Sequence, residues 1–211
     1  MNMLRMKNAI KTLWGSEVLA FFSAVMLGLS AIAAILFGTK EIFAGMGISL
    51  LLGLMGSIAS LAAFIMELIA LNNASKDNEK FKKALYVVCA GIVISLLLGF
   101  FQKVTIVNTI DIICSGIVNI LYAYFVVEAC LDLCPNLSET GKKCEIIVIT
   151  TLFLSLVFDV MNNFIESTVG VVISAIYVLV AAIAYYFLIT FLTKVNNELG
   201  NLDPNPGSFQ Q

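Results

Sequence analysis

The chain is divided by long runs that carry no charged residue. Four such runs, of 19 to 27 residues, occupy positions 18–39, 42–66, 84–102 and 167–193. Two further apolar stretches, 105–131 and 146–165, are similar in length but contain acidic residues. A helix needs about 20 predominantly apolar residues to cross a bilayer. The pattern therefore predicts six spanning helices.

These stretches define an all-α, polytopic integral membrane protein. Helices are expected at about 18–38, 45–71, 84–102, 105–131, 146–165 and 168–193. They form a single six-helix domain, 18–194, between an N-terminal segment, 1–17, and a flexible tail, 195–211. The connections around Lys40, Lys103 and Glu166 are short, whereas the alternate connections are longer and polar. We therefore expect the helices to form three hairpins.

The basic residues lie mainly on one side of this predicted topology. Ten of them fall in the N-terminal segment, the second and fourth loops and the C-terminal tail: Arg5, Lys7, Lys11, Lys76, Lys80, Lys82, Lys83, Lys142, Lys143 and Lys194. The opposite side carries only Lys40 and Lys103. Loops rich in Lys and Arg stay in the cytoplasm. Both termini are therefore expected to be cytoplasmic. The membrane is expected to be a plasma (inner) membrane.

The N-terminal segment allows two interpretations. Its apolar residues lie near one helical face, and the basic residues lie largely off it; the face contains Met3, Met6, Ile10, Leu13 and Trp14. It is either a short amphipathic helix on the inner membrane surface or a basic flank that orients the first span. It also resembles a signal peptide, but the apolar run that follows exceeds the roughly 7–15 residues of a signal core. We expect the first helix to remain.

Composition supports the membrane class and excludes others. Of 211 residues, 60% are apolar and 12% are charged, and the mean hydropathy is +1.00. A soluble domain carries about 25% charged residues. This chain therefore has too few charged residues to cover the surface of a soluble globule of its size. The net charge of −2 and the lack of a basic block give no basis for a nucleic-acid partner. Histidine is absent, which excludes imidazole chemistry.

Small residues recur every fourth position in the first three predicted helices. These faces contain Ala20, Ala24 and Gly28; Ser49, Gly53 and Ser57; and Gly91, Ser95 and Gly99. Such faces allow helix backbones to approach closely in lipid. Packing within one subunit is the favoured interpretation, and docking of a partner membrane subunit or a second copy is the alternative.

Polar residues form one stripe on each of the fourth and fifth helices. The fourth carries Asn108, Asp111, Ser115, Asn119 and Tyr122; the fifth carries Asp159, Asn162, Asn163 and Glu166. Steps of three and four place each set on one helix face. At 1.5 Å per residue, Asp111 and Asp159 lie roughly 8–9 Å inside the outer boundary. We expect these two carboxyls to share a polar cavity.

Carboxyls at membrane depth mark a pathway or site unless they are protonated or bonded as structural contacts. The candidate ligand residues for a cationic solute or proton are Asp111, Asp159, Asn108, Asn119, Asn162, Asn163, Ser115 and Tyr122. The alternative is that these acids are protonated, or bonded to side-chain amides, and only hold helices together. Glu67 and Glu128, near the inner interface, form a candidate inner gate; ordinary interfacial charge is the other interpretation.

No catalytic or metal motif is present in the sequence. The five cysteines lack paired C-x2-C spacing, and neither a nucleophile elbow nor a phosphate-binding loop occurs. We therefore expect a non-enzyme without metal or cofactor. The preferred function is a small-solute transporter, or the membrane-embedded substrate-binding subunit of one, for a cationic or proton-coupled solute. The alternative is a membrane scaffold or accessory subunit without a substrate.

Overall fold

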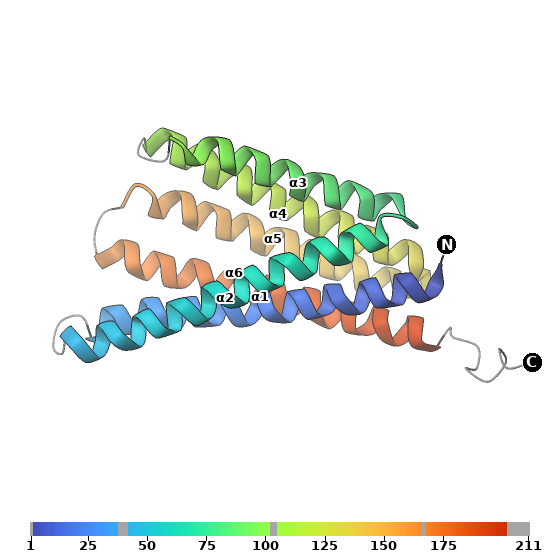
Figure 1. The fold of residues 1–211 in the computed structure, drawn as a ribbon, viewed down its shortest axis with the longest axis horizontal. Coiled ribbons are helices and arrows are strands. Elements are labelled where there is room, and N and C mark those ends of the chain that lie inside the picture. Colours follow the sequence, from blue (N-terminus) through green and yellow to red (C-terminus); the bar gives the residue numbers. More distant parts are fainter. Residues whose placement is uncertain (1, 38–41, 102–104, 166–167, 202–211) are drawn as a thin grey trace, which may run out of the picture.

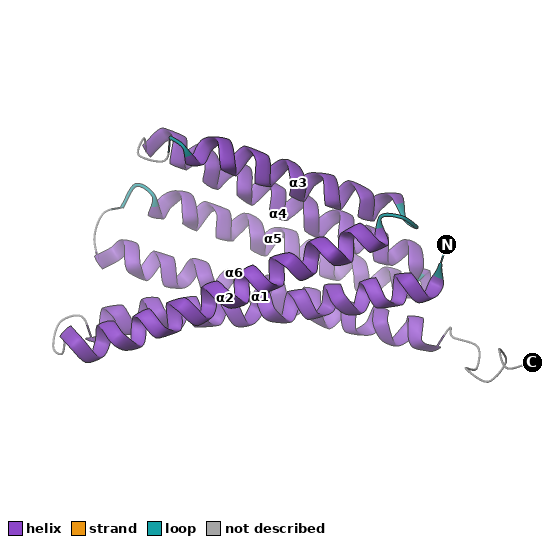
Figure 2. Ribbon diagram, in the orientation of Figure 1, coloured by secondary structure: helices purple, strands orange, loops and turns teal. Residues whose placement is uncertain are grey.

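The computed structural model describes residues 2–37, 42–101, 105–165 and 168–201. Within these ranges it contains six α-helices and one 3-10 helix (Figure 2). They are α1 (Met3–Phe37), α2 (Ile42–Ala74), α3 (Glu79–Gly99), α4 (Thr105–Leu133), η1 (Pro135–Leu137), α5 (Ser138–Asn162) and α6 (Thr168–Asn201). The connections predicted around Lys40, Lys103 and Glu166 lie outside the described residues.

The all-helical fold is confirmed, and six of the described helices are long and apolar enough to cross a membrane. They run along the long axis of the molecule (Figure 1). Each packs against the next in chain order, and α6 packs against α1, so the helices form a closed ring. The contact between α2 and α3 is the least extensive in this ring. The contact of α6 with α1 is about as extensive as its contact with α5. Helix packing therefore does not single out three hairpins, and that grouping stays a prediction.

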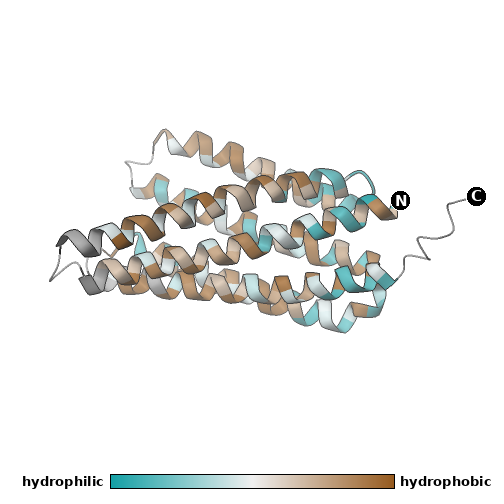
Figure 3. Cartoon of the chain, turned by 60° about the horizontal axis from the view of Figure 1, so that its bottom comes forward, coloured by the Kyte–Doolittle hydropathy of each residue, from teal (hydrophilic) through white to brown (hydrophobic). Residues whose placement is uncertain are grey.

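The start of α1 and the end of α6 lie at the same end of the bundle, which we call the terminal end (Figure 1). Hydrophilic residues concentrate there, and apolar residues dominate along the rest of the helices (Figure 3). Ion pairs between segments help to hold this end together. Arg5 lies 3.4 Å from Asp77, and the Lys80 ammonium lies 2.8 Å from carboxylate oxygens of both Glu128 and Asp132.

Several helices extend beyond the predicted spans at the terminal end. The predicted segment 1–17 is continuous with the first span, because α1 runs without a break from Met3 to Phe37. Its apolar face packs inside the bundle: Met6, Ile10 and Leu13 are at most 1% exposed. Uncharged runs mark only the part of a helix that can lie in lipid, so they underestimate helices that continue beyond it.

The C-terminal helix also extends beyond its predicted span. Helix α6 continues to Asn201, seven residues into the predicted tail 195–211, and the rest of that tail lies outside the described residues. Val195 and Leu199 are at most 1% exposed, because they continue the buried face of Phe191 and Leu192 by steps of four. The main hydrophobic core therefore includes residues beyond the predicted membrane domain.

Helix α3 begins five residues before its uncharged run. Asn78 has an extended backbone and its side chain accepts hydrogen bonds from the backbone N–H groups of Lys80 and Phe81, which is N-cap geometry. Phe81 is fully buried. The cap fixes where the charged turn with Lys80 meets α4.

Small residues pack α1 closely against α2. The Ser23 hydroxyl donates to the Gly56 carbonyl at 2.8 Å, and the Ser30 and Ser49 hydroxyls each donate to the other's carbonyl. A Cβ added at Gly56 would lie 2.9 Å from the Leu27 side chain. Of the predicted α2 face, Ser49 and Gly53 lie against Ser30 of α1, whereas the Ser57 hydroxyl donates within α2 to the Gly53 carbonyl. On the predicted α1 face, a Cβ added at Gly28 would lie 3.1 Å from Val178 of α6.

Candidate functional site

A central cavity of about 450 Å³ lies inside the ring of helices. All six helices contribute to its wall. Its polar lining residues are Ser16, Glu17, Glu67, Ser95, Ser115, Asn119, Tyr122 and Tyr185. The remaining lining residues are apolar. A closed ring explains why one cavity touches every helix, since each helix presents one face to the middle.

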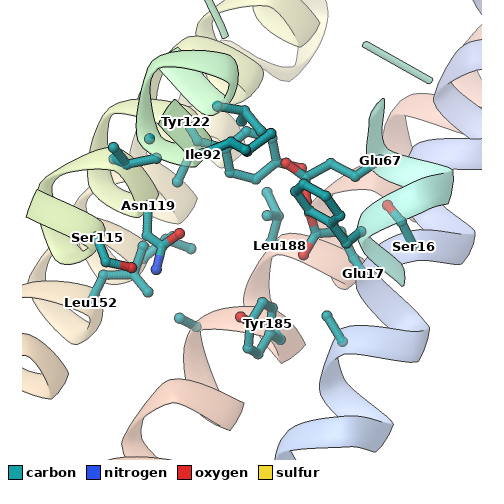
Figure 4. A pocket seen from close by; sticks show the side chains of 18 of the residues that line it. Ser16, Glu17, Glu67, Ile92, Ser115, Asn119, Tyr122, Leu152, Tyr185 and Leu188 are labelled. Atoms are coloured by element: carbon teal, nitrogen blue, oxygen red, sulfur yellow. The ribbon is translucent and has the colours of Figure 1, made fainter. Parts of the chain in front are cut away.

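Two carboxyl groups line one side of this cavity (Figure 4). Glu17, on α1, is 3% exposed, and the Tyr122 hydroxyl on α4 donates a hydrogen bond to its carboxylate at 2.6 Å. Glu67 comes from α2 on the same side. In the described part of the chain, no hydrogen bond or ion pair to the Glu67 side chain is present, so its carboxyl remains available to a ligand.

The opposite wall presents neutral polar groups. Ser115 and Asn119 project from α4 towards the cavity, across from Glu17 and Glu67 (Figure 4). Both are exposed although α4 lies within the bundle, because the cavity borders them. Steps of four and three along α4 place Ser115, Asn119 and Tyr122 on one face, as the predicted stripe requires.

A second, smaller cavity of about 40 Å³ lies between α4, α5 and α6. Its wall includes Asp159, Ser155 and Tyr177. Ser115 and Asn119 line this cavity as well as the central one, and Leu152 does the same from α5. The two cavities therefore share part of their walls.

The other predicted asparagines tie α4 to the end of α5. The Asn108 side-chain amide donates to the Asn163 side-chain oxygen, and Asn163 donates in turn to the Thr109 hydroxyl at 2.8 Å. Helix α5 ends at Asn162, so Asn163 lies in the following turn rather than in the predicted helix 146–165. A Cβ added at Gly170 of α6 would lie 3.2 Å from the Asn162 oxygen.

The two predicted aspartates have different neighbours. The Ser95 hydroxyl of α3 donates to the Asp111 carboxylate at 2.8 Å, and Asp111 lines neither of the two cavities. Asp159 instead faces α4 and α6 across the small cavity. Among the described residues no contact joins Asp111 to Asp159, and a cavity shared by both stays a prediction.

The two glutamates of the predicted inner gate are also separated. Glu67 lines the central cavity, whereas Glu128 accepts a hydrogen bond from Lys80 at the terminal end. The environment of Glu128 thus matches the interpretation as interfacial charge. Only Glu67 lies where it could contact a solute in the central cavity.

Glu17 is the residue that sequence analysis missed. It immediately precedes the first uncharged run and was therefore grouped with the polar flank. Its burial follows from the continuation of α1 into the bundle at the terminal end. The available signal was the apolar face at Met6, Ile10 and Leu13, which indicates a packed helix up to and beyond Glu17.

In the described ranges, no group of three or more acidic, cysteine or histidine residues could hold a metal ion. Cys130, Cys134 and Cys144 are free and buried in the core. Burial, together with the nearby Glu198 carboxylate, raises the pKa of the Cys134 thiol above its usual range. A protonated, buried thiol is a poor nucleophile and a poor metal ligand.

No protein-family model matches this sequence, and no curated protein or solved structure matches it. Function is therefore argued from the geometry of the two cavities.

Proposed function

We propose that the protein is a small-solute membrane transporter, or the membrane-embedded substrate-binding subunit of one, and that its solute is cationic or proton-coupled. The observation that carries this proposal is the pair Glu17 and Glu67 in a 450 Å³ cavity lined by all six helices. Cavities of about 300–1,000 Å³ hold small organic ligands.

The charge of the cavity favours a cation. Burying a carboxylate in apolar surroundings is costly unless it is protonated or paired. In the described chain, the lining of the cavity contains two carboxyls and neither Lys nor Arg. The missing positive charge can come from a bound amine or from protons, and exchange between the two would couple solute to proton. The apolar residues of the wall suit the carbon skeleton of a small amine.

We further propose that the protein lies in the plasma membrane with both termini in the cytoplasm, as expected from the sequence. We also propose that its helices are grouped as three hairpins. The support is the concentration of basic residues towards the terminal end. Positively charged segments remain cytoplasmic during insertion. The inner part of the central cavity, with Glu17 and Glu67, would then lie nearer the cytoplasm, and Asp159 nearer the outside.

Binding can be tested on the purified chain in detergent. A panel of small amines and inorganic cations is screened for thermal stabilisation, because a ligand at 100 times its dissociation constant stabilises by about 2.7 kcal/mol. The affinity of an active amine is then measured in Glu17→Gln and Glu67→Gln. We expect a loss of about tenfold or more in each, since truncating one member of a buried charge pair costs roughly 2–5 kcal/mol.

Glu139→Gln provides the matched control. Glu139 is an exposed acid paired with Lys143 one turn away, remote from both cavities, and its replacement should leave the affinity unchanged. An amine that binds equally well to both cavity variants would contradict the proposal. The scaffold alternative predicts a different result: no amine stabilises the chain, and a membrane protein copurifies with it.

A further inference from the structure

The two cavities differ in size in a way that separates two kinds of ligand. The central cavity, at about 450 Å³, accommodates an organic molecule, whereas the small cavity has about 40 Å³. One water needs roughly 10–15 Å³ of such volume. The small cavity therefore has room for a single ion with a water molecule or two, and it is too small for an organic solute.

The lining of the small cavity is rich in oxygen. Five of its nine residues carry a side-chain oxygen: Ser115, Asn119, Ser155, Asp159 and Tyr177. The Ser155 hydroxyl donates to the Leu152 carbonyl, which leaves its oxygen lone pairs able to accept. Hard cations prefer oxygen ligands of this kind. In the described chain, the lining includes one carboxyl and no Lys or Arg.

We infer that the small cavity is a binding site for one monovalent inorganic cation of the Na⁺ type, with Asp159 as its charged ligand, and that this cation is coupled to the solute in the central cavity. The inference rests on the proposed function. It goes beyond it by assigning the coupling ion and its residues.

The ligand set determines the charge of the ion. A single carboxylate balances one positive charge, so a divalent cation would leave one positive charge uncompensated. A proton would need only the Asp159 carboxyl. The four neutral oxygen-bearing residues around it match coordination of a metal cation instead.

The shared wall provides the coupling. Ser115 and Asn119 border both cavities, and the Asn119 amide offers an acceptor oxygen and a donor nitrogen. A cation beside Asp159 attracts these oxygens towards α5, which changes the lining of the central cavity. Linkage requires the solute to change the cation affinity by the same factor.

Close packing of α4 on α5 holds the site together. A Cβ added at Gly116 would lie 2.5 Å from the Leu156 side chain. Gly116 follows Ser115 directly, and Leu156 lies between Ser155 and Asp159 in the sequence. The absence of a side chain at Gly116 thus lets the oxygens of α4 and α5 face one cavity.

Direct binding of radiolabelled Na⁺ to the purified chain tests the site without any solute. We expect binding that unlabelled Na⁺ displaces, abolished in Asp159→Asn and weakened in Tyr177→Phe, a milder change that keeps the ring. Glu139→Gln is the control, because Glu139 is an exposed acid paired with Lys143 and lines neither cavity; it should bind Na⁺ normally. Absence of displaceable binding to the wild type, or full binding by Asp159→Asn, would overturn the inference.

Linkage to the amine separates this inference from the proposed function. We expect Na⁺ to change the affinity of an active amine about five- to 150-fold in the wild type, and to have no effect in Asp159→Asn. The Glu67→Gln variant should still bind radiolabelled Na⁺, while its affinity for the amine falls about tenfold or more. Amine binding that depends on Glu67 but is indifferent to Na⁺ would overturn the inference and leave the proposed function standing. Na⁺ binding lost in Glu67→Gln would also overturn it, since the cation would then lie in the central cavity.

Discussion

The hydrogen bond between Tyr122 and Glu17 is a sensitive test of the ring of helices. It joins α4 to α1 across 105 residues of sequence, at 2.6 Å, between side chains that are 8% and 3% exposed. Tyr122→Phe removes only the hydroxyl and keeps the ring of the side chain. The change therefore deletes the contact without opening a cavity of more than one atom.

The size of the effect follows from burial. Hydrogen bonds to charged groups contribute about 1.5–3 kcal/mol in soluble proteins. Side-chain hydrogen bonds between membrane helices average only about 0.6 kcal/mol, with a maximum of about 1.7. Because this bond is short and its acceptor is a buried carboxyl, we expect a loss of about 1.5 kcal/mol. For a chain of this length that lowers the melting temperature by roughly 3–6 °C.

The assay is thermal unfolding of the purified protein in detergent. Tyr124→Phe is the matched control, because Tyr124 lies on the same helix but is 37% exposed, and no hydrogen bond of its hydroxyl is present among the described residues. A double-mutant cycle with Glu17→Gln then isolates the pair, with an expected coupling of about 1 kcal/mol. Equal melting temperatures for Tyr122→Phe and Tyr124→Phe would refute the placement of Glu17 beside Tyr122.

Two further predictions concern orientation and packing. Reporter fusions at the C-terminus and in the α2–α3 connection should both report the cytoplasm, and fusions near Lys40 and Lys103 the outside; an outside signal from the C-terminus would contradict the proposed topology. Gly53→Leu or Gly56→Leu should destabilise the chain by about 1–3 kcal/mol through overpacking against α1. Gly47→Leu should not, since a Cβ there has no neighbour within 4 Å. An unchanged melting curve for Gly56→Leu would mean that α1 and α2 are farther apart than in this structure.

Sequence alone was sufficient for the class of fold. The spans at 84–102 and 105–131 correspond to α3 and α4, which begin and end within about five residues of the predicted bounds. The polar stripe on α4 was visible for the same reason. Both depend on the period and length of a single helix, which any continuous segment displays without its neighbours.

The boundaries at the terminal end were less predictable. Charges such as Arg5, Lys80 and Glu139 lie outside the apolar runs but within helices, because at that end they pair with other charges or reach water. Helices α1, α5 and α6 therefore continue well past their predicted bounds. This extension buries Glu17, which the linear pattern assigned to a flank.

Only the tertiary structure decided which polar faces meet. The sequence placed Asp111 and Asp159 at similar depth, yet Asp111 bonds to Ser95 of α3 and Asp159 faces Tyr177 of α6 across the small cavity. Helix periodicity fixes which residues share a face, but not the neighbour that the face contacts. In lipid, no hydrophobic force selects that neighbour, so close packing and interhelical hydrogen bonds select it. These contacts involve residues far apart in the chain, and the closure of α6 on α1 is what brings Glu17, Glu67 and Tyr122 around one cavity.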